Sequence, residues 1–123
     1  MQFSHMELSA IVKAAQGMIA ADGRVDDSEM KILSAELINF GVKPDQLKSM
    51  VELSEAMEPA LMIAVLGAMN DSQKRYVCGF LASIMVVDGD IDDSEMKFWK
   101  MVSTFIGCPT MSLQDALSYW SNN

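Results

Sequence analysis

The chain has 123 residues, half of them hydrophobic, which suits one folded domain with its own core and excludes a disordered chain. Its formal net charge of −8 excludes nucleic acid as a partner, because such binding needs cations that replace phosphate counterions. The longest uncharged apolar stretch, 76–87, is too short to span a bilayer, and the first residues do not form a signal peptide. We therefore expect a cytoplasmic protein without direct membrane insertion.

Apolar residues recur at helical spacing along the whole chain, and strand signals are nearly absent. The first predicted helix begins at a capping box of Ser4 and Glu7 and ends at the turn Asp22-Gly23. The other predicted helices cover about 27–40, a segment beginning at Pro44, 58–69, 71–87, a segment after Asp92 that includes Phe98 to Ile106, and 112–120. The fifth is apolar on nearly every side and should be central. The fold class expected is all-α, a compact seven-helix domain over residues 1–123.

The chain also repeats itself. Residues 22–31 and 88–97 are identical at eight of ten positions, at an offset of 66 residues. The same offset relates Gly41 to Gly107, so each half reads as a helix, an acidic turn and a second helix, over about 7–41 and 73–107. We interpret this pattern as an internal duplication with an approximate two-fold axis, in which each half buries the apolar faces of the other.

The acidic residues gather in the repeated turn. Windows 22–29 and 88–95 hold nine of the 17 acids, and Arg24 is the only cation in them. One interpretation is that these acids cap the helices that follow and complement the helix dipole. The alternative is a cation site, since carboxylates without His or thiolate favour hard ions such as Ca²⁺, Mg²⁺ or Mn²⁺. An EF-hand is excluded, because the sixth position of the loop is Asp27 or Asp93 where a glycine is required.

Catalytic residues are not predicted. His5 is the single histidine and stands at the chain start, where nothing pairs with it in the manner that catalysis needs, and the chain has no phosphate-binding glycine loop. Cys78 reads as a small core residue and Cys108 as a loop residue, without metal-ligand spacing. The 12 methionines are interpreted mainly as core residues, with a flexible partner groove as the alternative.

The doubled motif Asp22-Gly23-Val25-Glu29 and Asp88-Gly89-Ile91-Glu95 resembles the TerB-like family, over most of the chain. The resemblance implies a compact seven-helix domain of tellurite-resistance and stress-response systems. Similar domains form the N-terminal part of membrane-anchored DnaJ-type co-chaperones. Without a J-domain signature or a membrane span, the chain is more similar to the free-standing type. The resemblance also implies cation binding by the acidic turns, which carries over to Asp22, Asp26, Glu29, Asp88, Asp92 and Glu95.

Two functions follow from these patterns. The first is a non-enzymatic module that responds to a hard divalent cation in tellurite or metal stress. The alternative is a protein–protein interaction scaffold, whose acidic turns are helix caps and a docking surface. Both imply a protein partner, whose identity the sequence does not give. Direct binding of an oxyanion is disfavoured, because the acidic face would repel it.

Overall fold

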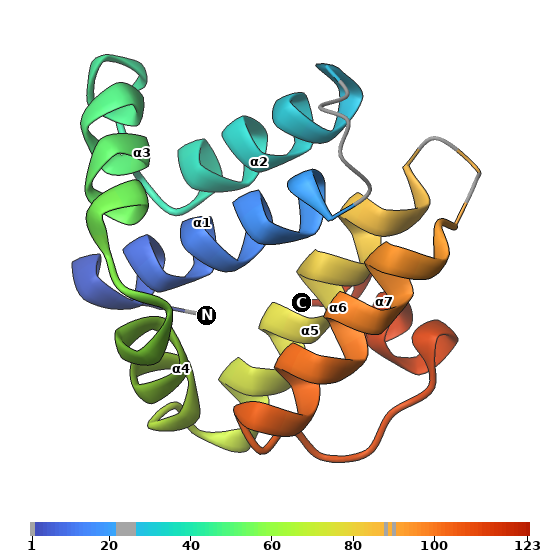
Figure 1. Cartoon of the computed structure of the whole chain (residues 1–123). Coiled ribbons are helices and arrows are strands. Elements are labelled where there is room, and N and C mark those ends of the chain that lie inside the picture. Colours follow the sequence, from blue (N-terminus) through green and yellow to red (C-terminus); the bar gives the residue numbers. More distant parts are fainter. Residues whose placement is uncertain (1, 22–26, 88, 90) are drawn as a thin grey trace.

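The structure is a computed structural model of the whole chain, and it describes residues 2–21, 27–87, 89 and 91–123 (Figure 1). Within these residues the regular structure is helical throughout, which confirms the predicted all-α fold. The helices are α1 (His5–Ala20), α2 (Asp27–Asn39), the short 3-10 helix η1 (Pro44–Gln46), α3 (Leu47–Ala56), α4 (Pro59–Gly67), α5 (Asp71–Val86), α6 (Asp93–Phe105) and α7 (Leu113–Ser121).

Two helices begin at reciprocal capping boxes. Ser4 Oγ accepts the Glu7 N–H at 3.1 Å, and the Glu7 carboxylate accepts the Ser4 N–H at 2.7 Å. At the start of α5, Asn70 Oδ1 accepts the Gln73 N–H at 2.8 Å, and Gln73 Oε1 accepts the Asn70 N–H at 3.1 Å. Each box satisfies two backbone donors that the helix itself leaves without partners. The predicted box at Ser4 is confirmed.

Glycines end α2 and α6 at matching places. Gly41 has a φ of +89° and Gly107 a φ of +72°, the left-handed region that closes a helix with little strain only at glycine. The predicted end of α1 at Asp22-Gly23 lies outside the described residues, and α1 itself ends at Ala20 with Ala21 as its C-cap.

The offset of 66 residues relates the helices as well as the motifs. It carries both ends of α1 onto those of α5, and both ends of α2 onto those of α6. The helices of each pair therefore have equal lengths, 16 residues for α1 and α5 and 13 for α2 and α6. The two helix pairs thus match in length, and they differ in their side chains and in what covers them.

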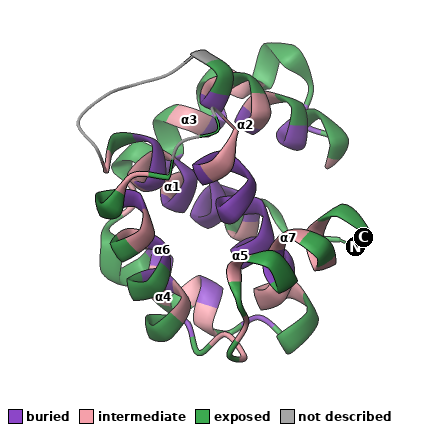
Figure 2. Ribbon diagram, turned by 90° about the vertical axis from the view of Figure 1, so that its right-hand side faces the viewer, coloured by how far each residue is buried: buried purple, intermediate pink, exposed green. Residues whose placement is uncertain are grey.

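The core lies between α1 and α5, where Figure 2 shows the buried positions concentrated. On α5, the ten consecutive residues from Tyr76 to Met85 are buried, as expected for the central helix. On α1 the buried face contacts α3, α4, α5 and α6. Burial of such aliphatic side chains contributes about 1.5–3 kcal/mol each relative to exposure. The two long helices are therefore the rigid frame on which the other elements are positioned.

Different elements cover the two central helices. α7 packs closely on α5, where Gly79 leaves room for the Ala116 carbonyl and for Trp120. A Cβ at Gly79 would collide with both. The equivalent residue on α1 is Lys13, which α3 covers, and its Nζ donates to the Ser54 carbonyl at 3.3 Å.

Among the described residues, none of the helices combines the length and apolar character needed to cross a membrane. Met18, Met50, Met62, Met69 and Met85 are buried, which fits the core interpretation of the methionines.

Candidate functional site

The structure describes three of the six predicted metal ligands. Glu29 lies in the first turn of α2, Asp92 is the N-cap of α6, and Glu95 lies in the first turn of α6. Asp22, Asp26 and Asp88 lie outside the described residues. The six residues are therefore not brought together by the described part of the chain, and the cation site stays a prediction.

Glu29 and Glu95 are buried, with 3% and 2% of their surface exposed. They are equivalent residues of the two repeats. The capping-box residues Glu7 and Gln73, which lie near the starts of α1 and α5, are only half-buried. A buried carboxylate must be compensated by hydrogen bonds or by a positive charge. In both repeats, therefore, the glutamate that follows the acidic turn is buried. It is buried more deeply than Glu7, which caps α1 from a half-buried position.

Asp92 acts as a helix cap. Its Oδ1 accepts the Ser94 N–H at 2.7 Å, and its carboxylate lies at the N-terminus of α6, where the helix dipole favours negative charge. The capping interpretation of the acidic turn is thus correct for this residue. An oxygen that accepts one N–H has further lone pairs, so capping does not exclude metal coordination by the same carboxylate.

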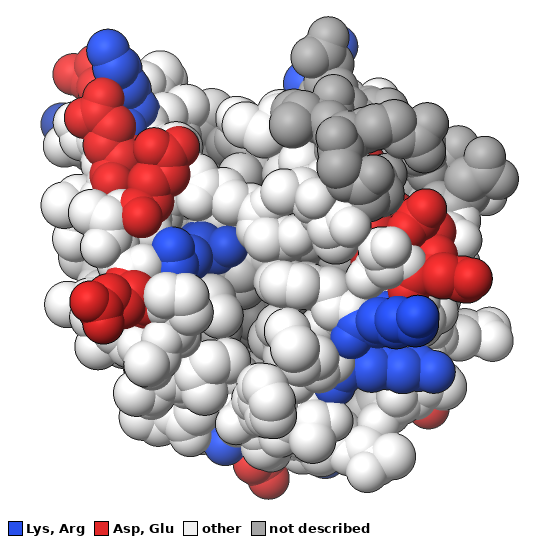
Figure 3. All heavy atoms as spheres, in the orientation of Figure 1, with Lys and Arg blue, Asp and Glu red and all other residues white. Residues whose placement is uncertain are grey.

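Among the described residues, no cluster of three or more His, Cys, Asp or Glu side chains is positioned to hold a metal ion. Figure 3 shows acidic side chains along α3 and near the start of α6, with a mostly uncharged face between them. The charge of the described surface is therefore divided between separate elements.

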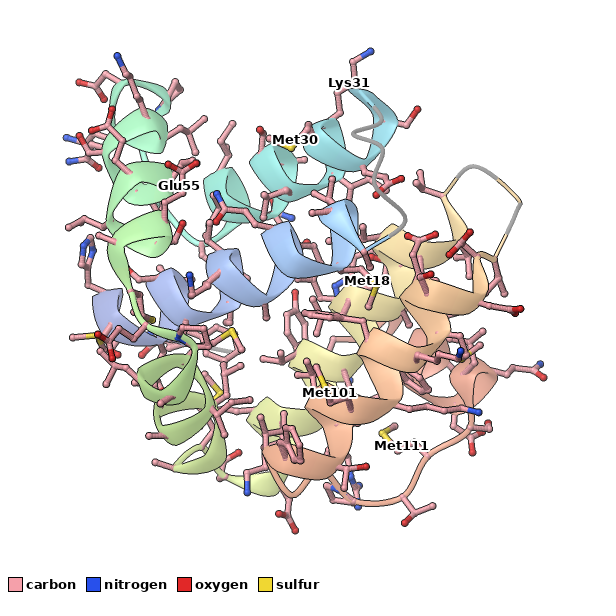
Figure 4. The ribbon with its side chains drawn as sticks, viewed as in Figure 1. Met18, Met30, Lys31, Glu55, Met101 and Met111 are labelled. Carbon is pink, nitrogen blue, oxygen red and sulfur yellow. The ribbon has the colours of Figure 1, made fainter. Side chains whose placement is uncertain are left out.

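An apolar groove of about 730 Å³ lies on this face, between α1, α4 and α6. Phe105, at the end of α6, is 62% exposed, and Met101 is 45% exposed. In Figure 4, Met101 on α6 and Glu55 on α3 lie on opposite sides of this region. Gly17 lines the groove, and its lack of a side chain leaves room for the Phe98 ring, with which a Cβ at this position would collide.

The groove was not predicted from the sequence. Phe98 and Phe105 lie in the predicted helix after Asp92 together with Trp99 and Val102, and of these four residues only Trp99 and Val102 are buried. Helical spacing identifies an apolar face but not whether another helix covers it. One signal in the sequence could have indicated the groove. The apolar residues extend farther around this helix than one neighbouring helix can cover.

A buried polar contact joins α2 to α5. The Tyr76 hydroxyl donates a hydrogen bond to Glu36 Oε1, and both residues are buried. Burial raises the pKa of Tyr76 above its ordinary value of 10.0, and the hydrogen bond to Glu36 raises it further. The Phe3 and Phe40 rings surround this tyrosine with centroid distances of 5.8 and 5.7 Å. Aromatic rings enclose this hydrogen bond, which we therefore interpret as a structural contact that holds α2 against α5.

Comparison with known proteins places this fold. The chain is similar to a protein of unknown function, PG1108, from Porphyromonas gingivalis W83, with 37% sequence identity and a TM-score of 0.85. The match covers 99% of this chain and 92% of that one. No curated protein matches the chain. The family described as Tellurite resistance protein TerB matches residues 8–117, which is most of the chain. The chain therefore belongs to the TerB family.

Proposed function

We propose that the protein is a non-enzymatic module that responds to a hard divalent cation in tellurite or metal stress. Membership of the TerB family supports the association with tellurite resistance. The observation that carries the cation proposal is the burial of Glu29 and Glu95 at equivalent places in the two acidic turns. Carboxylate oxygens are the ligands that Ca²⁺, Mg²⁺ and Mn²⁺ prefer.

The proposed ligands are the six acids of the two turns. Each repeat would supply one buried glutamate, Glu29 or Glu95, and two aspartates, which are Asp22 and Asp26 or Asp88 and Asp92. A cation bound among them would neutralise like charges that otherwise repel one another. Binding would stabilise the turns between α1 and α2 and between α5 and α6, and so change the surface offered to a protein partner.

Calorimetric titration of Ca²⁺, Mg²⁺ and Mn²⁺ into chelator-treated protein tests this proposal. We expect heat from at least one ion, and a rise in melting temperature. At a ligand concentration of 100 times Kd, binding adds about 2.7 kcal/mol to the free energy of unfolding. Glu29→Gln combined with Glu95→Gln should abolish binding. Glu7→Gln, a change at the half-buried capping glutamate of α1, is the matched control and should leave it unchanged.

Two results would contradict the proposal. The first is the absence of both heat and thermal shift with all three ions. The second is binding by the double glutamine variant with unchanged affinity, which would place the site outside the buried glutamates.

The second candidate function is a protein-interaction scaffold, and the exposed groove between α1, α4 and α6 favours it. Exposed apolar surface of this kind marks interaction sites on many soluble proteins. The two candidates differ in what disrupts partner binding. A scaffold that binds through the groove loses its partner with Phe105→Asp and keeps it in the presence of chelator, whereas a cation-dependent module loses it when the cation is removed.

A further inference from the structure

A separate group of sulfur atoms lies at the other end of α6 from the acidic turn. The segment between α6 and α7 carries Cys108 and Met111, and both line a cavity of about 290 Å³ together with Cys78 of α5. Figure 4 shows the Met111 side chain directed from this segment toward α6. Cys78 is 1% exposed, whereas Cys108 and Met111 are half-buried, so one side of the group is open.

Both cysteines line the same cavity. Their backbones are held by neighbouring residues on α6. The Trp99 indole N–H donates to the Cys78 carbonyl at 2.8 Å, and the Cys108 N–H donates to the Ser103 carbonyl at 3.0 Å. Ser103 Oγ also lies 3.4 Å from Cys78 Sγ. The thiol pair is thus positioned by α5, α6 and the turn after Gly107.

The other repeat shows that the fold does not need these thiols. At the offset of 66 residues, Cys78 corresponds to Val12 and Cys108 to Val42, and both valines are buried. Met111 corresponds to Asp45, which has no sulfur. An apolar pair packs the same backbone in the first half, so the sulfur atoms are a property of the second half alone.

Positive charge lies next to the thiols. Lys74 and Arg75 lie on the first turns of α5, in the neighbourhood of Cys108. Lys74 Nζ lies 3.5 Å from the position that a Cβ on Gly107 would occupy. The Arg75 Nε is buried and has no hydrogen-bond partner among the described residues. These cations suit an anionic group at this place.

We propose that Cys78, Cys108 and Met111 bind a soft metal ion of the Cu(I) class. Thiolate and thioether sulfur select Cu(I), and no carboxylate or imidazole side chain lines the cavity in the described structure. Zn²⁺ favours four ligands in a tetrahedron, whereas this cavity offers three sulfur atoms. On binding, each thiol loses its proton to solvent, and two thiolates with one Cu⁺ carry a net charge of −1. Lys74 and Arg75 offset that charge.

This site is independent of the acidic turns, and its ion belongs to a different chemical class from the hard cations proposed there. Reduced protein should be titrated with Cu(I) without oxygen, in competition with a chromophoric Cu(I) chelator. We expect one equivalent bound per chain, with a rise in melting temperature.

The decisive variant combines Cys78→Val with Cys108→Val, because valines already fill the equivalent positions in the first repeat. It should fold with the helical content of the wild type. Its Cu(I) affinity should fall by more than about 100-fold, beyond the loss of about 10- to 100-fold typical of residues that only support a ligand. Met111→Leu should weaken binding by a smaller factor. Met101→Leu removes a thioether of the groove and should have no effect.

Equal Cu(I) affinity in the wild type and in the double valine variant would overturn the proposal. A loss with Met101→Leu as large as that with Met111→Leu would do the same. Should the double variant fail to fold, Cys108→Ser decides, because this half-buried residue lies outside the helices, and retained binding in that variant overturns the site.

Discussion

The helices of the pair α1–α2 begin and end at residues equivalent to those of the pair α5–α6, yet the central helices of the two pairs are covered differently. α3 covers α1, and Lys13 extends its amine to the Ser54 carbonyl. α7 covers α5, and at the equivalent position Gly79 carries no side chain. The backbone of a repeat is therefore compatible with two kinds of neighbour, and the choice is made by a few side chains on the outer face.

Polar groups are distributed unequally as well. Tyr76 and Glu36 form a buried hydrogen bond between α5 and α2, whereas their equivalents, Ala10 and Val102, are both apolar and fully buried. Each half thus contributes one member to the Tyr76–Glu36 link, and in each case the equivalent position of the other half is apolar. Three predictions test how far these differences matter.

The largest effect is expected at Gly79. Gly79→Ala places a Cβ against the Ala116 backbone and Trp120, so α7 must move away from α5. We expect the free energy of unfolding to fall by about 3 kcal/mol, near the upper end for overpacking. Chemical denaturation of both proteins measures this. Gly67→Ala is the control, because its Cβ would meet the Ile106 carbonyl at an ordinary 3.8 Å. Equal stability of the two variants would show that α7 is not held at this distance.

A smaller effect is expected at Tyr76. Tyr76→Phe leaves the Glu36 carboxylate buried without its hydroxyl donor, which costs about 1–3 kcal/mol. Adding Glu36→Leu should recover most of this loss, because both positions then become apolar, as they are in the other half. Tyr119→Phe, on α7, is the control and should change little. Failure of Glu36→Leu to restore stability would mean that Glu36 has a role beyond this link.

The smallest effect concerns alkaline pH. Because the pKa of Tyr76 is raised in the folded state, its contribution to stability is complete below its ordinary value of 10.0 and is lost as the pH rises toward the folded value. One such group lowers the free energy of unfolding by at most about 1.4 kcal/mol per pH unit. Melting curves between about pH 9.5 and 11 should show a steeper decline for the wild type than for Tyr76→Phe. Parallel declines would contradict the assigned pKa direction.

Much of the fold could be predicted because it depends on local signals. Ser4 with Glu7 marks a helix start, and the glycines at positions 41 and 107 follow the ends of α2 and α6. The sulfur site could not be predicted, because Cys78 and Cys108 are 30 residues apart in the sequence and meet only through the packing of α5, α6 and the following turn.

Other features were missed for a different reason. Glu36 follows Leu33 and precedes Leu37, so it lies on a buried face of α2, but a charged residue on a helix is normally assigned to the surface. Tyr76 is on α5, 40 residues away, and sequence spacing does not indicate that it supplies the hydrogen bond. For the proposed cation site, the residue types could be read from the sequence, whereas the burial of Glu29 and Glu95 could be seen only in the fold.

The equal lengths of the paired helices have a consequence for engineering. Because α1 and α5, and likewise α2 and α6, align without insertion or deletion, every residue of these helices has an equivalent residue in the other half. Exchanges are compatible where both halves bury a side chain of similar size, as with valine for cysteine at positions 78 and 108. They fail where the covering element differs, as at Gly79, because α7 leaves no room there for the side chain of its counterpart Lys13. A protein in which both helix pairs have one sequence would therefore need new covering elements as well.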